Sequence, residues 1–176
     1  MVNQERFAEN TTIAIVMGVS GSGKTTVGQT LAAQLNWQFK DADDFHPPEN
    51  REKMSRGIPL NDADRQPWLR AMRQAIATAI AQGQNLVLSC SALKAAHRQT
   101  LADDWDALKW IYLQGSFELI QARMNQRQNH FMPAELLQSQ FDTLEPPDPQ
   151  AALYVDAALP VTAIVQEIIA NAIDIP

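Results

Sequence analysis

Apolar and polar residues alternate along this 176-residue chain in two patterns. Some short stretches are apolar and rich in β-branched residues, as expected of strands that are buried on both faces of a sheet; residues 12–17 (TIAIVM) and 86–90 (LVLSC) are the clearest. In other stretches apolar residues recur at helical spacing, as Val27, Leu31 and Leu35 do within residues 24–35. The chain therefore alternates between predicted strands and predicted helices.

The pattern predicts five strands in all, at residues 12–17, 37–40, 86–90, 108–113 and 153–155. The predicted helices occupy residues 24–35, 49–56, 62–83 with a cap at Asn61 or Asp62, 94–101, 116–127 and 133–141, and a last one opens at Pro160. Strands that alternate with helices imply right-handed crossovers and a parallel sheet covered on both faces. We therefore predict an α/β fold, a three-layer sandwich around a five-stranded parallel sheet, in one domain spanning residues 1–176.

Two irregular segments interrupt this order late in the chain. Residues 128–133 and 144–150 together hold four of the ten prolines. Segments of this kind usually run over the surface of a domain. We predict a lid within residues 123–147.

A glycine-rich segment, GVSGSGKT from Gly18 to Thr25, joins the first predicted strand to the first predicted helix. Successive backbone N–H groups at a helix N-terminus bind phosphate, and glycines let the main chain curl around the anion. In this P-loop pattern the lysine reaches the β and γ phosphates and the threonine hydroxyl holds Mg²⁺. We expect ATP and Mg²⁺ to be bound by Gly18, Ser20, Gly21, Ser22, Gly23, Lys24, Thr25 and Thr26.

This loop alone does not define a reaction, because GTPase-type switches, ATPase motors and small-molecule kinases share it. A glycine-rich turn that binds nothing is the plainer alternative, and the strand before the loop and the helix after it argue against that alternative. The chain has no GxGxxG segment, so the sequence does not predict a dinucleotide-binding site.

An acidic turn, DADDFHP, follows the second predicted strand. Side chains at the carboxyl end of a parallel strand face the crevice where open α/β sheets bind ligands. We expect Asp43 to accept or orient the proton of an acceptor hydroxyl and Asp41 to assist Mg²⁺. We expect His46 to bind the acceptor, although it is also an ordinary turn residue before a proline, and the whole segment is alternatively a solvated acidic turn.

Basic residues lie where they could face an anion. Lys53 and Arg65 lie in the stretch that follows the acidic turn, and Arg98 follows the 86–90 strand. A cation that reaches the pocket favours an acceptor with its own negative charge, whereas a solvated or ion-paired cation has no such role.

Two further arginines, Arg123 and Arg127, are four residues apart and are predicted to share one helix face. Phosphoryl transfer develops charge on equatorial oxygens, and lid arginines stabilise that charge while water is excluded. A merely solvated basic face is the alternative. With this pair, the expected catalytic residues are Lys24, Asp43, Arg123 and Arg127.

Composition narrows the class of partner. The net charge is −6, which gives no overall attraction to nucleic acid or to an anionic membrane. The polar first twelve residues lack the apolar core of a signal peptide, and no apolar run is long enough to span a bilayer. Cys90 is the single cysteine, so no internal disulfide forms. We expect a small-molecule acceptor and a cytoplasmic location.

The apolar positions also predict a core. Cys90 is expected to be a small buried apolar residue rather than a nucleophile. Five larger residues are expected to pack in the core: Met54, Trp68, Met72, Trp105 and Trp110.

Taken in order along the chain, these segments resemble the bacterial-type gluconokinases. The resemblance rests on MGVSGSGKT, DADDFHP, NREKMSRGIPLNDADRQPWL, CSALK with Arg98, and QARMNQRQNHF with QFDTLEPP, and it covers about residues 14–147. It implies a fold similar to nucleoside monophosphate and shikimate kinases, ATP-dependent phosphorylation of D-gluconate to 6-phosphogluconate, and a cytoplasmic homodimer. It implies that ATP and Mg²⁺ bind at Gly21, Gly23, Lys24 and Thr25, that Asp43 and His46 face the acceptor, that Lys53, Arg65 and Arg98 contact gluconate, and that Arg123 and Arg127 belong to the lid.

The residues alone indicate a kinase of a small, anionic acceptor, and gluconate comes from the resemblance. A kinase of shikimate or of a nucleoside monophosphate is the nearest alternative. A nucleotide-dependent regulatory switch without an acceptor is an alternative of a different class.

Overall fold

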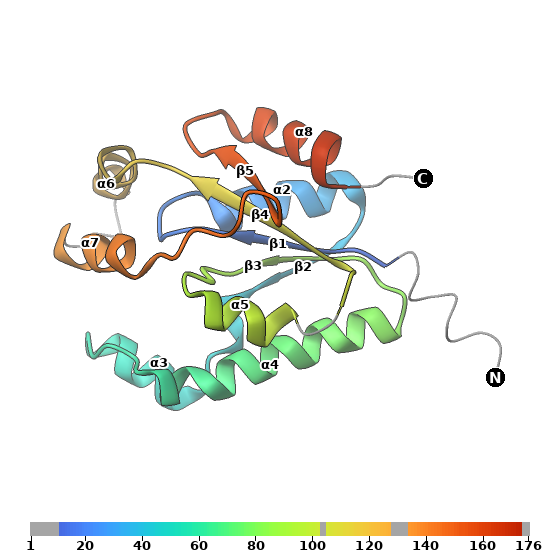
Figure 1. Ribbon diagram of the computed structural model, residues 1–176. Helices are drawn as coiled ribbons and strands as arrows, with labels where there is room; N and C mark the ends of the chain where they lie inside the picture. Colours follow the sequence, from blue (N-terminus) through green and yellow to red (C-terminus); the bar gives the residue numbers. More distant parts are fainter. Residues whose placement is uncertain (1–10, 103–104, 128–133, 174–176) are drawn as a thin grey trace.

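A five-stranded parallel sheet forms the centre of the computed structural model, which describes residues 11–102, 105–127 and 134–173 (Figure 1). The strand order is β2-β3-β1-β4-β5, and all neighbouring strands pair in parallel. The strands are β1 (Ile13–Met17), β2 (Gln38–Asp41), β3 (Leu86–Ser89), β4 (Leu108–Gln114) and β5 (Ala152–Asp156). The predicted α/β sandwich with a five-stranded parallel sheet is therefore confirmed.

Helices cover both faces of this sheet, as Figure 1 shows. They are α2 (Lys24–Leu35), the short 3₁₀ turn η1 (Ala42–Phe45), α3 (Pro48–Ser55), α4 (Asp62–Ala81), α5 (Ala95–Ala102), α6 (Phe117–Gln126), α7 (Ala134–Thr143) and α8 (Val161–Ala172). Within the described residues these elements, apart from η1, match the predicted ones, with ends that agree within about two residues; η1 lies within the predicted acidic turn. None of the described helices is both long and apolar enough to cross a membrane.

Each face of the sheet has its own apolar core because side chains alternate along a strand. Ile13 and Ile15 of β1 face α4 and α5, where they pack with Met72 and Ile76. Ala14 and Val16 face the opposite side with residues of α2 and α8. The centre of β1 is buried on both faces, which explains its continuous apolar sequence.

A third, smaller cluster lies at the carboxyl end of the sheet. Val19 of the glycine-rich loop is buried there against Ile120 and Met124 of α6 and Leu137 of α7. A Cβ atom at Gly21 would lie 2.6 Å from the sulfur of Met124, and Gly21 has a φ of 81°. The left-handed backbone favours glycine at this position, and a Cβ atom would also displace the end of the Met124 side chain.

Two features differ from the sequence predictions. Met54 is 43% exposed, so the prediction that it packs in the core is wrong. Helix α6 ends at Gln126, and Arg127 adopts an extended backbone. Arg123 and Arg127 therefore do not continue one helix face, although their spacing predicted it. Residues 128–133 of the predicted lid lie outside the described residues.

Candidate active site

The glycine-rich loop leaves the N-terminus of α2 open to an anion. No side chain caps this helix end, and its first turn carries no acidic residue. A Cβ atom at Gly23, which has a φ of 100°, would meet nothing within 4 Å. The unpaired N–H groups and the partial positive charge of a helix N-terminus attract phosphate. The loop geometry therefore fits a nucleotide phosphate.

Lys24, the first residue of α2, lies against this loop. Its Nζ donates a 2.9 Å hydrogen bond to the carbonyl oxygen of Val19. Burial lowers the pKa of Lys24 from 10.5 to about 8, although the negative charges of Asp43 and Asp41 act in the opposite direction. Burial disfavours the charged form of an amine, and a nearby negative charge stabilises it. An anion bound beside Lys24 would therefore interact strongly with its ammonium group.

Asp41 connects the glycine-rich loop to the acidic turn. The Oγ1 of Thr25 donates a 2.7 Å hydrogen bond to Asp41 Oδ2, and the backbone N–H of Asp43 donates to Asp41 Oδ1 at 3.0 Å. Neighbouring oxygens in an octahedral Mg²⁺ shell lie about 2.9 Å apart. The Thr25 and Asp41 oxygens therefore have a separation that suits one Mg²⁺ ion. No group of three or more His, Cys, Asp or Glu side chains that could hold a metal ion occurs among the described residues.

The acidic turn is held by α4. Trp68 of α4 donates from Nε1 to the carbonyl oxygen of Ala42 at 2.7 Å. The ring of His46 stacks on Trp68, with centroids 4.7 Å apart and planes 6° apart. Burial lowers the pKa of His46, so its imidazole is neutral at neutral pH and offers one donor and one acceptor nitrogen.

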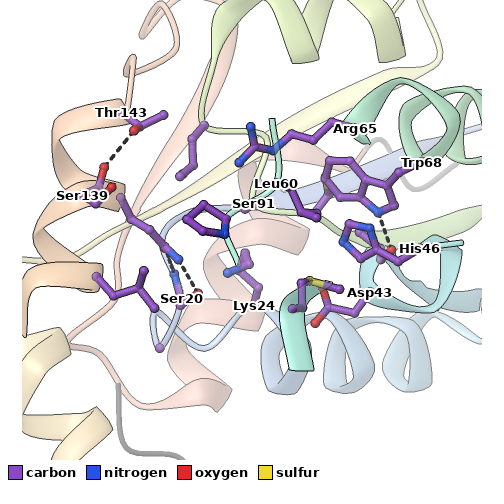
Figure 2. Close-up of a pocket in the computed structure, with 18 of the residues that line it drawn as sticks. Ser20, Lys24, Asp43, His46, Leu60, Arg65, Trp68, Ser91, Ser139 and Thr143 are labelled. Carbon is purple, nitrogen blue, oxygen red and sulfur yellow. Dashed lines mark hydrogen bonds between the residues drawn. The ribbon is translucent and has the colours of Figure 1, made fainter. Parts of the chain in front are cut away.

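These residues line one cavity of about 630 Å³ at the carboxyl ends of β1, β2 and β3. Figure 2 shows the side chains of Lys24, Asp43, His46 and Arg65 around it. The cations on its wall are Lys24, Arg65, Lys94 and Arg127, and His97 lines it as well. Asp62 lies 3.2 Å from Lys94 and 3.6 Å from Arg65, so these two cations are held beside each other.

Cys90 also lines the cavity, and it is 1% exposed. Burial raises the pKa of its thiol to about 12. The thiol is therefore protonated at neutral pH and is not a nucleophile. The sequence prediction of a buried apolar cysteine is confirmed.

Comparison with known proteins gives the family. Residues 20–170 match the family described as shikimate kinase. A probable gluconokinase of Xenopus tropicalis is 47% identical over 172 residues, which cover 89% of this chain and 90% of that protein. The chain belongs to the shikimate kinase family, and within it to the gluconokinases. The gluconokinase of Gluconobacter oxydans is 42% identical over 156 residues, or 88% of each chain. A crystal structure of a gluconokinase from Sinorhizobium meliloti has a TM-score of 0.82 and 44% identity, and covers 92% of this chain and 90% of its own.

In this gluconokinase-family fold, many of the predicted site residues meet around the cavity. They are Ser20, Gly21, Lys24, Thr25, Asp41, Asp43, His46, Arg65 and Arg127. Gly18, Ser22, Gly23 and Thr26 belong to the loop or to the start of α2 without lining the cavity.

Three predicted basic residues lie away from the cavity lining. Lys53 forms a 2.7 Å ion pair with Asp64. Arg98 donates from Nη1 to the carbonyl oxygens of Ala92 and Leu93, at 2.8 and 3.2 Å, and so holds the loop before α5. Arg123 lies on α6, half-buried. Their roles toward the substrates stay predictions.

Sequence reasoning assigned no role to several residues that line the cavity of this chain. Lys94 and His97 line it from the start of α5, and Gln140 and Ser139 line it from α7. The spacing of Lys94 and His97 after a buried strand was a usable signal, because side chains at strand ends face the crevice. Gln140 is 120 residues from its hydrogen-bond partner Ser20, and no local pattern indicates such a contact.

Proposed function

We propose that this protein transfers the γ-phosphoryl group of ATP to the 6-hydroxyl of D-gluconate, which gives 6-phosphogluconate and ADP. The observation that carries the proposal is the hydrogen bond between Thr25 and Asp41, because it joins the phosphate loop to the acidic turn in one cavity. Proteins that share more than 40% of its sequence are named gluconokinases. That identity favours gluconate over the acceptors of the wider shikimate kinase family.

The phosphate half of the proposed site is built from the loop and the start of α2. Bound ATP would supply the phosphoryl group, and a Mg²⁺ ion would neutralise negative charge on its phosphates. The N–H groups of the loop and the ammonium group of Lys24 would face the phosphates, while Thr25 and Asp41 would hold the Mg²⁺ ion. The uncapped helix end and the 2.7 Å separation of the Thr25 and Asp41 oxygens support this assignment.

Asp43 is the proposed general base. Its backbone is fixed by the hydrogen bond to Asp41, and its side chain lines the cavity within the electrostatic reach of Lys24. The gluconate hydroxyl transfers its proton to the Asp43 carboxylate while its oxygen forms the new bond to phosphorus, and the bond from phosphorus to the β-phosphate oxygen breaks. His46, oriented by Trp68, contacts another hydroxyl of the acceptor.

The carboxylate of gluconate needs a cation, and Arg65 and Lys94 are the proposed partners. Both line the cavity, and Asp62 holds them near each other without filling the cavity itself. Two charge-assisted hydrogen bonds would fix the acid end of the substrate. Contacts of Lys53 and Arg98 with gluconate are less direct proposals, since both are engaged with other groups.

Arg127 is the proposed partner of the charge that develops on the transferred group, since it lines the cavity at the end of α6. A role for Arg123 requires that the lid moves toward the cavity, a step that also excludes water. We also propose that the protein is a homodimer, which its mass in solution by light scattering would test.

The decisive experiment is an acceptor panel. ADP release is measured by a coupled assay with gluconate, other sugar acids, shikimate and nucleoside monophosphates, and the phosphorylated product is identified by mass spectrometry. We expect turnover with gluconate well above the rate without acceptor. Preference for shikimate or for a nucleotide would replace gluconate as the substrate. Tight nucleotide binding without any phosphorylated product would favour a regulatory switch.

A further inference from the structure

Helix α7 contacts the phosphate loop through one side-chain amide. The backbone N–H of Ser20 donates to Gln140 Oε1 at 2.7 Å, and Gln140 Nε2 donates to Ser20 Oγ at 2.9 Å. Both ends of the amide are therefore satisfied by one residue of the loop. Ser20 and Gln140 both line the cavity, so this contact faces the space that the proposed ligands occupy.

Glu145, the second residue after the end of α7, contacts the loop before α5. The N–H of Glu145 donates to the carbonyl oxygen of Leu93 at 2.9 Å, and Glu145 Oε2 accepts from the N–H of Ala95 at 2.6 Å. Ala95 is the first residue of α5, where a carboxylate is favourable because of the helix dipole. Glu145 therefore fixes the loop that carries Lys94.

The backbone of the loop before α5 is strained, and contacts from other residues stabilise it. Ala92 has a φ of 44°, a left-handed conformation that is costly for a residue with a Cβ atom. Arg98 holds the carbonyl oxygens of Ala92 and Leu93 from within α5. Glu145 adds a second contact from outside α5, so the position of Lys94 depends on the segment that follows α7.

Apolar packing joins the same two loops. Val19 of the phosphate loop and Leu137 of α7 are buried in one cluster, and Leu93, Phe141 and Leu144 pack against it. Close-packed groups transmit a displacement instead of absorbing it. The phosphate loop, α7 and the loop before α5 therefore form one connected unit between two binding regions.

We propose that residues 140–145 are a strap that couples the two substrates, with Gln140 and Glu145 as its positioning residues. Occupation of the phosphate loop orders Ser20 and, through Gln140 and Glu145, the loop that presents Lys94 to the acceptor. Each substrate then strengthens the binding of the other by the same factor, as linkage requires. The inference rests on the proposed function, because it assigns ATP and gluconate to the two ends of the strap.

The test measures a coupling factor by titration calorimetry. The factor is the dissociation constant of a non-hydrolysable ATP analogue with Mg²⁺ in the absence of gluconate, divided by that constant at saturating gluconate. We expect about fivefold or more for the unmodified protein. Gln140→Met, which keeps the side-chain volume and removes both hydrogen bonds, should bring the factor toward 1. Glu145→Leu should do the same, and Glu145→Gln, which keeps an oxygen acceptor, should restore most of it.

Gln138→Met is the matched control on the same helix, since Gln138 is exposed and bonds to Asp142 within α7. It should leave the coupling factor unchanged. An unchanged factor in Gln140→Met, an equal loss in Gln138→Met, or no coupling in the unmodified protein would each overturn the strap. If Gln140→Met fails to fold, Ser20→Ala removes the hydroxyl partner from the loop side, and a coupling factor unaffected by that change would overturn the strap as well.

These titrations, together with the acceptor panel, separate the two proposals. A protein that does not phosphorylate gluconate would refute the proposed function itself. A protein that phosphorylates gluconate and keeps its coupling factor in Gln140→Met would refute only the strap.

Discussion

The imidazole of His46 lies flat on the indole of Trp68, with ring centroids 4.7 Å apart and planes 6° apart. The same indole is 5% exposed and donates to the carbonyl oxygen of Ala42 at 2.7 Å. One buried side chain of α4 therefore holds both the backbone of the acidic turn and the orientation of His46. A change at Trp68, which lies in the core, should therefore also affect His46, which lies in the site.

Trp68→Phe tests this relationship, since it keeps an aromatic ring and removes the N–H donor. We expect the free energy of unfolding to fall by about 1–3 kcal/mol, because the carbonyl of the buried Ala42 loses this partner. We also expect the KM for gluconate to rise, because His46 loses part of its support. Urea unfolding and steady-state kinetics measure the two effects.

Trp110→Phe is the control in the same core, and it should leave the KM for gluconate unchanged. An unchanged KM in Trp68→Phe would show that the stacking of His46 on Trp68 does not contribute to acceptor binding.

Lys24→Met should remove turnover without weakening the fold. Burial lowers the pKa of Lys24 to about 8 from 10.5, so the charged lysine is disfavoured in the folded protein. The charged lysine therefore lowers the free energy of unfolding. This loss is fully present below pH 8 and disappears as the pH rises from about 8 toward 10.5. At pH 7 the variant should therefore unfold at the same temperature or higher, while ATP binding weakens because the phosphate-facing cation is gone. Near-normal activity would contradict the assignment.

The same pKa predicts that nucleotide binding takes up protons. At a pH just above 8 part of the Lys24 population is neutral in the free protein. Phosphate charge restores the proton, since a nearby opposite charge raises the pKa of an amine. Calorimetric titration at pH 8.5 in two buffers with different ionisation enthalpies measures this uptake. We expect a fraction of one proton for the unmodified protein and none for Lys24→Met; equal uptake in both would assign the proton to another group.

The sequence was sufficient to predict the fold because its pattern is regular. Strands with continuous apolar runs and helices with regular apolar spacing have few alternatives. Of the two predicted caps, Asn61 and Asp62, it is Asn61 that caps α4, in a reciprocal capping box with Asp64. The wrong prediction for Met54 has a physical reason as well. Its apolar side chain predicts burial, yet it lies on α3 at the rim of the cavity, where 43% of it is exposed.

The candidate site was predictable where function depends on local geometry. Lys24 and Thr25 begin the helix that follows β1 and its glycine-rich loop, and Asp41 ends β2, so their position in the sequence gives their position in space. The contacts of Arg98 and Gln140, in contrast, could not be predicted from their local sequence. Whether Arg98 faces the cavity or its own loop carbonyls depends on the left-handed turn at Ala92, and the contact of Gln140 with Ser20 depends on how α7 packs. Neither has a signature in a single sequence.

Asp43→Asn should lower kcat by about 10²-fold or more, the usual contribution of a general base. The amide retains the shape of the side chain and its place on the cavity wall but does not accept a proton. Binding of ATP should be unaffected, since Thr25 and Asp41 are unchanged. Single-turnover kinetics measure the chemical step directly. Asp44→Asn, at the exposed neighbouring position, is the control and should keep its rate. A change confined to KM in Asp43→Asn would make Asp43 a binding residue instead.

Arg65→Gln and Lys94→Met should each raise the KM for gluconate about tenfold or more, because each removes a charge-assisted hydrogen bond to the carboxylate. The two losses should not add, since Asp62 contacts both cations and shifts toward the one that remains. Arg70→Gln, at an exposed position of α4, is the matched control for lost positive charge. Steady-state kinetics with gluconate and with its uncharged lactone-derived amide separate the effects, because the amide lacks the charge. Equal losses for gluconate and the amide would place the carboxylate elsewhere in the cavity, with Arg65 and Lys94 acting on the phosphates.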